Sequence, residues 1–329
     1  MKGFSHIYIE ENIKEHPRTL SILAKVKTSK KILIKDYKEI FCRPSQDFLL
    51  QKQRPSLIIA KKKGKFVYPL PEVCQDFGVK QSYYASPVLN CIYNCSYCFL
   101  QGMYPSAYIV AFVNQEDFFD EVKSLLQDTP INLSISYDTD LLATENIFGF
   151  AKEWIEFAHK NTELLLEIRT KSSNYRAISG LTPAKNVILA WTLSPEEIIS
   201  RFEKNTPSLV ARIWSIQSAI KDGWKIRLCF DPIFDIENVE EIYRNFFQTV
   251  FKEIPQEKIY DAGVGLFRMN EGYFKKAKRL MPSKEIFLYP YSLIDGVISY
   301  NTEARERLTE IIEKEIFSYM CREKVFFWK

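Results

Sequence analysis

Three cysteines, Cys91, Cys95 and Cys98, lie at spacings of four and three residues in one short stretch. Thiolates are soft ligands, and a group of them suits Zn²⁺, Cu⁺ or an iron–sulfur cluster. A structural zinc site normally needs a fourth cysteine or histidine at a matching spacing, and none of the three histidines is near. A cluster held by three thiolates leaves one iron free to bind a small molecule and pass it an electron. The stretch therefore favours an iron–sulfur cluster over zinc.

Length and composition limit the class of protein. The chain has 329 residues, 46% hydrophobic and 26% charged, and its formal net charge is +4. These proportions are ordinary for a globular protein with a sizeable core, and the small charge permits a polyanionic partner without arguing for one. Seven cysteines with one tight cluster do not resemble a secreted disulfide framework. Neither a signal sequence nor a membrane span is recognisable, so we expect a cytoplasmic protein.

Short β-prone runs alternate with helical stretches from residue 83 onward. This alternation predicts parallel strands joined by crossovers. About six such units, with no GxGxxG after any strand, favour a closed or partly closed β/α barrel over a dinucleotide-binding fold. Chemistry in such barrels lies at the carboxyl ends of the strands, and the cysteines follow the first strand. The predicted strands are residues 84–88, 108–113, 131–137, 164–170, 187–193, 225–230 and 261–267.

The predicted helices between these strands carry recognisable start signals. Residues 145–160 have an apolar face with helical period. Ser194 is predicted to cap the start of another helix, with Pro195 at its first helical position. The division we expect is an N-terminal α/β extension over residues 1–80, a barrel over 81–284, and a C-terminal lid region over 285–329. The last region should hold a strand at 286–288, a tyrosine-rich turn and a final helix from about residue 302 to 319.

The CxxxCxxC spacing with an aromatic residue, Tyr97, before the third cysteine resembles the radical S-adenosylmethionine (SAM) superfamily. The resemblance implies a partial (β/α)6 barrel of the TIM type and a [4Fe–4S] cluster on Cys91, Cys95 and Cys98. It also implies that SAM binds the fourth iron and that an electron cleaves it to methionine and a 5′-deoxyadenosyl radical, which abstracts hydrogen from substrate. The electron would come from an external reductant such as flavodoxin or ferredoxin. Tyr97 would flank SAM and support its adenine.

Further segments resemble the spore photoproduct lyase family, in which a radical SAM enzyme reverts 5-thyminyl-5,6-dihydrothymine in DNA to two thymines. The resemblance implies a monomeric carbon–carbon lyase of the DNA-repair type, with lesion-containing DNA as its partner. It runs almost end to end, through residues 6–10, 98–101, 108–114, 169–171, 202–213, 232–234 and 267–268.

Three residues are implied to hold SAM. Lys171 closes an apolar strand, so its ammonium should lie among the barrel loops, where it can pair with a carboxylate; in the family the lysine binds the SAM carboxylate. Thr139 and Thr192 match serines that contact SAM. For these two threonines, ordinary packing or a local turn bond is an equally good interpretation.

The chain departs from the family at the group that returns hydrogen to the product. Tyr137 stands at the position of the family's donor cysteine, and Phe99 at that of a relay tyrosine. Tyr137 is therefore one candidate donor, through its phenol. Cys229 is the other, because alternation places it on one strand face with Arg227 and Asp231, which suggests a wet barrel lumen. A buried structural thiol is the alternative interpretation of Cys229.

Substrate contacts are implied at Tyr300 and Arg268, where base stacking and lid packing are both reasonable interpretations. Cys42 and Cys74 are interpreted as ordinary buried thiols. The first hypothesis is thus a photoproduct lyase, and the second a radical SAM paralogue with another nucleic-acid or small-molecule substrate. The third is a non-catalytic iron–sulfur or nucleic-acid-binding protein, because a fold alone does not decide function.

Overall fold

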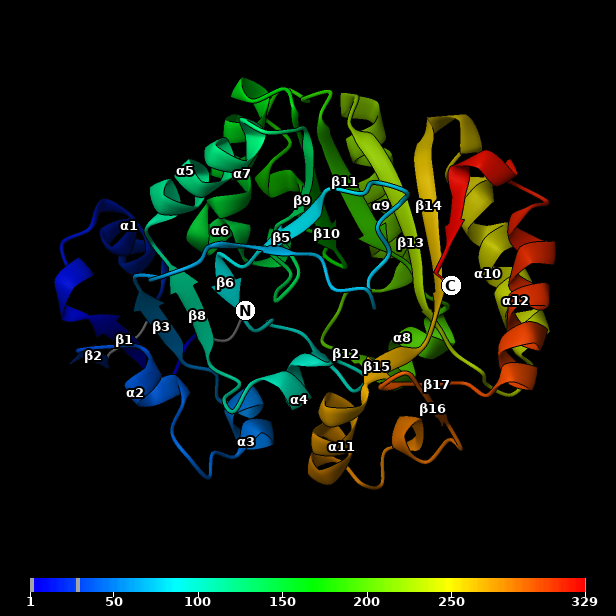
Figure 1. Ribbon diagram of the computed structural model, residues 1–329, viewed down its shortest axis with the longest axis horizontal. Helices are drawn as coiled ribbons and strands as arrows, with labels where there is room; N and C mark the ends of the chain where they lie inside the picture. The colour runs from blue at the N-terminus through cyan, green and yellow to red at the C-terminus, as the bar shows by residue number, and fades with distance from the viewer. Residues whose placement is uncertain (1–2, 28–29, 329) are drawn as a thin grey trace.

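Two parallel-rich β-sheets organise the computed structural model, which describes residues 3–27 and 30–328 (Figure 1). The smaller sheet has the order β2-β1-β3-β8-β6, and all its neighbours are parallel except β6 and β8. Every residue of β3 and β8 is buried, which explains their continuous apolar sequences. The strands are β1 (Ile7–Glu10), β2 (Lys31–Ile34), β3 (Leu57–Ala60), β6 (Val88–Leu89) and β8 (Ile109–Phe112).

The strand predicted at residues 108–113 is therefore present as β8, but it pairs with β3 of the N-terminal sheet instead of with the barrel strands. The run predicted at 84–88 is also divided, into β5 and β6. Pro87 lies in the gap, where its missing N–H cannot serve a ladder. Three helices accompany this sheet: α1 (Pro17–Lys25), α2 (Lys38–Phe41) and α3 (Phe48–Gln53).

The larger sheet is the predicted partial barrel. Its order is β4-β5-β9-β10-β11-β13-β14-β18, and β5 to β14 are parallel, neighbour to neighbour. The sheet begins at β4 and ends at β18, so it curves without closing among the described strands (Figure 1). The bounds are β4 (Val67–Pro69), β5 (Ser82–Ala85), β9 (Ile131–Ser134), β10 (Leu164–Thr170), β11 (Val187–Thr192), β13 (Lys225–Ile233), β14 (Ile259–Leu266) and β18 (Val325–Phe327).

The helices that connect these strands along the chain lie on the outside of the sheet (Figure 1). The helix predicted at 145–160 is divided at Gly149, whose φ of 74° is left-handed, a conformation that glycine adopts readily. Trp154 and Ile155 in the second half are buried, as the periodicity predicted. The helices are α5 (Gln115–Leu126), α6 (Glu145–Phe148), α7 (Phe150–Lys160), α8 (Glu196–Phe202), α9 (Leu209–Asp222) and α10 (Val239–Glu253). The short α4 (Leu100–Met103) lies apart from them, beside α11 (Glu271–Leu280) (Figure 1).

The C-terminal region packs under the barrel as a three-stranded antiparallel sheet of β15 (Arg268–Asn270), β17 (Val297–Ser299) and β16 (Ser292–Ile294). Helix α11 (Glu271–Leu280) lies beside it, and α12 (Thr302–Ile316) leads to β18. The strand predicted at 286–288 is wrong: Glu285–Phe287 forms a single 3-10 turn with Ile286 and Phe287 buried. The boundaries at residues 80 and 284 stay predictions.

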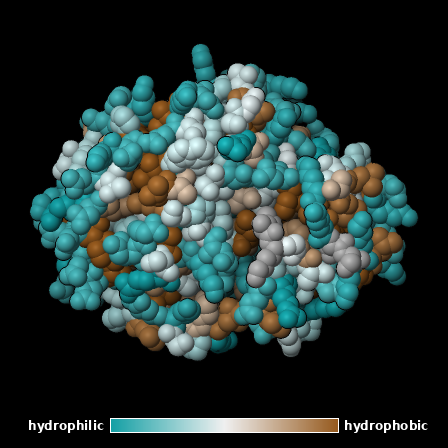
Figure 2. Space-filling view, turned by 180° about the vertical axis from the view of Figure 1, so that it is seen from behind, coloured by the Kyte–Doolittle hydropathy of each residue, from teal (hydrophilic) through white to brown (hydrophobic). Residues whose placement is uncertain are grey.

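The face opposite to that of Figure 1 is mainly hydrophilic, with separate hydrophobic patches (Figure 2). This is the surface expected where amphipathic helices cover a core. Within the described ranges, no helix is both long and apolar enough to cross a membrane.

Candidate active site

The cysteine stretch forms a loop between β6 and α4 and is tied to the segment after α8. Two of its residues form β7 (Asn94–Cys95), which pairs antiparallel with β12 (Glu203–Lys204). The Ser96 N–H donates to the Phe202 carbonyl over 2.8 Å. From α3, Lys52 Nζ donates to the carbonyls of Cys91 and Tyr93 over 2.6 and 2.9 Å. These contacts fix the loop near the carboxyl ends of the barrel strands (Figure 1).

The three thiols fit an iron–sulfur cluster by their chemistry, although within the described residues they are not gathered into a metal-binding set. Cys95 is buried and the other two are partly buried. Outside this loop, the prediction that Cys42 is a buried thiol is wrong, because its side chain is exposed, and Cys74 is only partly buried. Burial raises the pKa of Cys91 to about 11 and also raises the pKa of Cys98, while the Lys52 charge lowers both. Lys171 acts in the same direction on Cys95 and Cys98. The charges of Lys52 and Lys171 favour the thiolate form of these cysteines. The thiolate is the form that binds a soft metal centre such as an iron–sulfur cluster.

Lys171, directly after β10, lies beside the cysteine loop. Its Nζ is 3.9 Å from Glu203 Oε1 and 5.4 Å from the centre of the Tyr97 ring. The Tyr97 hydroxyl donates to the same carboxylate oxygen. The structure therefore brings Lys171 and Tyr97 together at the cysteine loop, and the roles predicted for them toward SAM stay predictions.

The shared carboxylate of Glu203 was not predicted. The fully buried Arg212 guanidinium donates to Glu203 Oε2, and Ser194 Oγ donates to Oε1 over 3.3 Å. Burial raises the pKa of Glu203, but the charges of Lys171 and Arg212 outweigh it, and the net effect lowers that pKa. The Glu203 carboxylate is therefore ionised, and its single negative charge is shared between the cations of Lys171 and Arg212. Ser194 serves this network instead of capping α8, whose first turn has no side-chain cap, so the predicted capping role is wrong.

Asp140 joins two strand ends and was also missed as a site residue. Its Oδ1 accepts from Thr170 Oγ1 over 2.7 Å and from the Ala143 N–H over 3.0 Å. Its Oδ2 accepts from the Lys171 N–H over 2.6 Å. The sequence holds no local signal for either residue, because Arg201 and Lys204 flank Glu203, and Asp138 and Thr139 precede Asp140, so neither carboxylate is distinguished from a surface residue.

Two hydroxyls near Asp140 are buried without a partner. Thr139 Oγ1 and Ser136 Oγ make no hydrogen bond, although these residues are only 7% and 8% exposed. Buried polar atoms almost always have a hydrogen-bond partner, so a bound molecule would supply the partners that these two hydroxyls lack. Thr192 is also buried, and its carbonyl accepts from Arg212 Nη1 over 3.0 Å. The roles predicted for the two threonines toward SAM stay predictions.

The two candidate hydrogen donors lie in different surroundings. The Tyr137 ring, just beyond β9, is 4.4 Å from the Tyr84 ring and 5.3 Å from the Phe99 ring, centre to centre. Phe99 directly follows the third cysteine, so Tyr137 is next to the cysteine loop. Cys229 is buried on β13 among charged side chains; burial raises its pKa to about 12, while the Arg169 and Arg227 charges act in the opposite direction. Cys229 is thus enclosed among charged side chains, and its role as a hydrogen donor stays a prediction.

Charged side chains fill this part of the lumen. Arg227 donates to Asp261 Oδ2 and to Glu167 Oε2, each over 2.5 Å, and all three side chains are buried. The guanidinium carbon of Arg227 is 3.3 Å from the centre of the Phe77 ring. The lumen below the site is therefore plugged by an ion-pair layer.

The two residues implied to bind substrate are both committed to internal contacts. Tyr300 is 1% exposed, and its hydroxyl accepts from the Asp235 N–H over 2.8 Å. Arg268 donates to both carboxylate oxygens of Asp231, over 2.9 and 3.0 Å, and to the Val73 carbonyl over 2.8 Å. Their roles toward a substrate stay predictions, and the contacts give each a structural role.

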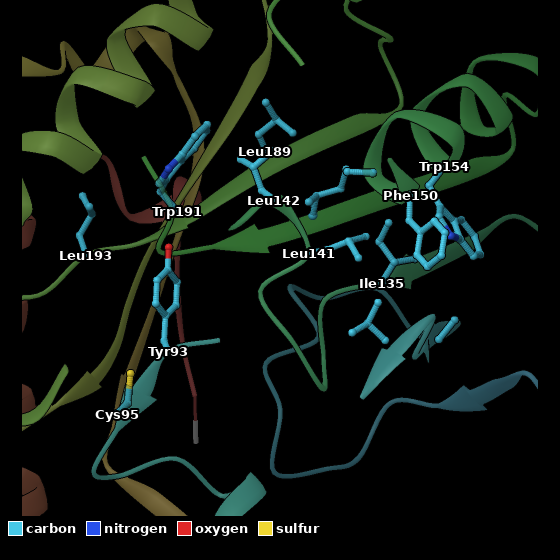
Figure 3. Packing of buried hydrophobic residues seen from close by; sticks show 14 of the residues in the cluster. Tyr93, Cys95, Ile135, Leu141, Leu142, Phe150, Trp154, Leu189, Trp191 and Leu193 are labelled. Carbon is cyan, nitrogen blue, oxygen red and sulfur yellow. The ribbon is translucent and has the colours of Figure 1, made fainter. Parts of the chain in front are cut away.

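Figure 3 shows Tyr93 and Cys95 at the ends of the barrel strands, with Tyr93 between the cysteine and Trp191. The Trp191 Nε1–H donates to the Ser172 carbonyl over 3.0 Å, so the ring is fixed. Tyr93 and Cys95 belong to the same buried cluster as Leu142 and Phe150, so the cysteine loop packs directly on the core.

A curved parallel sheet of this kind, with three cysteines in the loop beyond its first strand, is the partial barrel of radical SAM enzymes. Solved spore photoproduct lyases share it. The lyase complexed with dinucleoside spore photoproduct has a TM-score of 0.83 at 16% identity, covering 99% of this chain and 98% of that one. A lyase variant with bound AdoMet and the same dinucleoside has a TM-score of 0.83 at 17% identity, covering 100% and 99%.

Sequence comparison identifies the family. The family model described as "SPL: Spore photoproduct lyase" matches residues 76–324. The spore photoproduct lyase of Bacillus subtilis (strain 168) is 23% identical over 265 residues, 74% of this chain and 75% of the relative. That of Geobacillus sp. (strain Y412MC61) is 24% identical over 263 residues, 73% of each. The chain belongs to the spore photoproduct lyase family.

Proposed function

We propose that the chain is a radical SAM lyase that reverts a spore-photoproduct thymine lesion in DNA to two thymines. It acts as a cytoplasmic monomer and takes its electron from an external one-electron reductant such as flavodoxin or ferredoxin. The observation that carries the proposal is the placement of the cysteine loop, which includes Tyr97, against Lys171 at the ends of the barrel strands.

Each residue of the site has a definable task. Cys91, Cys95 and Cys98 hold a [4Fe–4S] cluster, and Lys52 fixes the backbone of their loop through two carbonyls. When bound, the cluster and SAM would supply the radical chemistry that hydrogen abstraction from the lesion needs. The ammonium of Lys171 binds the carboxylate of SAM.

Other residues orient these groups. Glu203 holds Lys171 and the Tyr97 hydroxyl in one place, because its carboxylate is itself fixed by Arg212. The unpartnered Thr139 hydroxyl is available to the same ligand. Tyr137, with an O–H bond beside the cysteine loop, is the proposed donor position toward the product.

The substrate follows from the family and from the chemistry of the reaction. Relatives in this family were solved with dinucleoside spore photoproduct, and a lesion inside a duplex must be extruded to reach such a site. Base stacking on aromatic side chains is the expected mode of contact.

The test begins with the protein reconstituted anaerobically with iron and sulfide and reduced by dithionite. We expect conversion of SAM to 5′-deoxyadenosine, and conversion of a spore-photoproduct dinucleotide to the thymidine dinucleotide. Cys95→Ala should abolish both, whereas Cys42→Ala, at an exposed cysteine, should retain both.

Two other results would change the conclusion. SAM cleavage without thymidine dinucleotide would indicate a paralogue that acts on another substrate. Retention of iron without any SAM cleavage would indicate a non-catalytic iron–sulfur protein.

A further inference from the structure

The loop between β3 and β4 carries four lysines around one glycine, in the sequence Lys61-Lys62-Lys63-Gly64-Lys65, and is called the lysine loop below. Lys61, Lys63 and Lys65 are exposed. Gly64 has a φ of 80°, and an added Cβ there would meet no other atom, so the tip of the loop lies in solvent. The match to the family model begins at residue 76, so the lysine loop lies outside it.

A buried carboxylate fixes the base of the lysine loop. Glu10, at the end of β1, accepts from the Lys61 N–H over 2.9 Å and from the Tyr37 N–H over 2.8 Å. It thereby joins the lysine loop to the segment after β2, which adds the exposed Lys35 and Lys38. The lysines of both segments therefore gather at the carboxyl end of the N-terminal sheet.

The positive charge of the lysine loop is only partly neutralised. Lys63 Nζ pairs with Asp36 over 3.1 Å, and Lys62 Nζ donates to the Tyr68 hydroxyl over 3.3 Å. Lys65 Nζ lies 5.5 Å from the centre of the Tyr68 ring. Within the described part of the chain, neither Lys61 nor Lys65 forms an ion pair with a carboxylate. These two ammonium groups are therefore available to an anion from outside.

A row of aromatic rings leads from the lysine loop to the cysteine loop. Strand β4 pairs antiparallel with β5, so Tyr68 stands opposite Tyr84, with ring centres 5.4 Å apart. The Tyr84 ring is 4.4 Å from that of Tyr137, which is 5.3 Å from that of Phe99. All four side chains are partly exposed. In Figure 1 the chain accordingly passes from β3 across to β5 of the barrel.

Cations beside partly exposed rings match the chemistry of a nucleic-acid strand, in which phosphates alternate with bases. Lysines near an edge strand such as β4 also prevent it from pairing with another molecule. That protective role requires no connection to the site. The row of rings supplies such a connection, and this favours nucleic acid as the anion.

We propose that the lysine loop binds backbone phosphates of the DNA that flanks the lesion. The inference rests on the proposed function and adds a surface of the N-terminal sheet to it. Three ring-to-ring steps of 5.4 Å or less separate the lysine loop from the cysteine loop, so the contacted phosphates lie within about one helical turn, about 34 Å, of the lesion. Such contacts position the DNA without reading its sequence.

The first test measures binding of undamaged DNA by the protein as isolated. A labelled duplex of about twenty base pairs, two helical turns, is titrated by fluorescence anisotropy over a range of NaCl concentrations. In the double variant Lys61→Gln/Lys65→Gln we expect about tenfold weaker binding at low salt. The slope of log K against log salt should become shallower by about 0.9 for each lysine that contacts a phosphate.

Two further variants separate charge from structure. Lys61→Arg/Lys65→Arg keeps both positive charges and should bind DNA as wild type does. Lys221→Gln/Lys252→Gln removes the same charge from exposed positions at the ends of α9 and α10, outside the barrel, and should also bind as wild type. An equal loss in this control would show that net charge alone is responsible and would overturn the proposal.

The second test compares two substrates of the reconstituted protein reduced by dithionite. One is the spore-photoproduct dinucleotide, which has no flanking DNA, and the other carries the same lesion inside the duplex. In Lys61→Gln/Lys65→Gln the ratio of kcat/KM on the duplex to that on the dinucleotide should fall about tenfold. An unchanged ratio would overturn the proposal, whether the two activities are retained or lost together.

A cationic loop can also bind an acidic electron carrier, and the same variant decides between the partners. If Lys61→Gln/Lys65→Gln binds DNA as wild type does but loses turnover only when flavodoxin replaces dithionite, the lysine loop is a docking surface for the reductant. That result would overturn the proposal.

Failure of the proposed function is distinguishable from failure of this inference. If the wild-type protein does not repair the dinucleotide, the proposed reaction is wrong, and the lysine loop is then judged on the affinity for undamaged duplex and on its salt slope. If the dinucleotide is repaired but affinity and slope are unchanged in Lys61→Gln/Lys65→Gln, the reaction stands and the inference is rejected.

Discussion

Replacing Glu203 by glutamine should destabilise the protein and disturb the SAM site together. The carboxylate is buried between the guanidinium of Arg212, which has no exposed side-chain surface, and the ammonium of Lys171, whose side chain is 18% exposed. It also accepts from the Tyr97 hydroxyl. The substitution keeps the shape of the side chain and removes the one negative charge that faces both cations.

The expected size follows from the burial of these partners. Removing one member of a buried ion pair costs about 3–5 kcal/mol, because the remaining charge stays in the interior without compensation. Glutamine can still accept the hydrogen bond from Tyr97, and Lys171 keeps some contact with water. We therefore expect a loss near the lower limit, about 3 kcal/mol in the free energy of unfolding, and a fall in Tm of roughly 4 °C for a chain of this length.

The pH dependence gives a sharper test, because the pKa of Glu203 is lowered in the folded protein. A carboxylate of this kind contributes stability that is complete above its unfolded pKa, about 4.3, and is lost as the pH falls through the lower folded value. The difference between wild type and Glu203→Gln should thus be constant from pH 7 to about pH 5 and shrink in more acidic solution.

Urea unfolding followed by tryptophan fluorescence and circular dichroism measures this difference, and SAM affinity is measured on the same samples. Glu163→Gln, at an exposed glutamate, controls for the loss of one surface charge and should leave both quantities unchanged. Wild-type stability in Glu203→Gln would refute the reasoning. A stability difference that vanishes between pH 7 and 5 would also refute it, because another group would then be responsible.

Three other substitutions test separate parts of the site. Lys52→Met should lower the iron retained after reconstitution severalfold without changing the circular dichroism spectrum, because it removes the cation that holds two carbonyls of the cysteine loop. Lys171→Met should weaken SAM binding by about tenfold, equivalent to about 1.4 kcal/mol, as measured by equilibrium dialysis on reconstituted protein. Arg227→Met leaves Asp261 buried without its cation, while Glu167 keeps Arg169, and should lower the free energy of unfolding by about 3 kcal/mol in urea titrations.

The sequence was sufficient for the barrel because its signals are local. Buried parallel strands are continuous apolar runs and the helices between them have apolar faces, so each element can be recognised within its own segment. Strand β8 has the same composition as the barrel strands, yet it pairs with β3. Pairing depends on the route of the whole chain, and composition carries no information about it.

The site was predictable only where chemistry and spacing coincide. The three cysteines and Lys171 have residue types that are unusual at the ends of apolar strands. Glu203 and Asp140 were missed because each acts through partners that are distant in sequence. Ser194 shows the same limit in the opposite direction: its position before Pro195 predicts a helix cap, but its hydroxyl binds the Glu203 carboxylate instead. A buried ion is a stronger demand than a terminal N–H group that water can satisfy.

The donor position follows a related logic. A group that returns hydrogen must lie beside the substrate radical, but no rule ties it to one strand, so its segment can differ while its place in the site stays the same. In this chain the strand-end position carries Tyr137, and Arg268 and Phe77 fix the segment before β5 to the barrel beside it. In this arrangement Arg268 is paired with Asp231 and does not reach toward a substrate. Breaking the contact with Arg268→Met should therefore reduce product formed per 5′-deoxyadenosine while leaving SAM cleavage intact, since it displaces the segment before β5 and not the cysteine loop. Equal loss of both would show that Arg268 supports the whole barrel and not this segment alone.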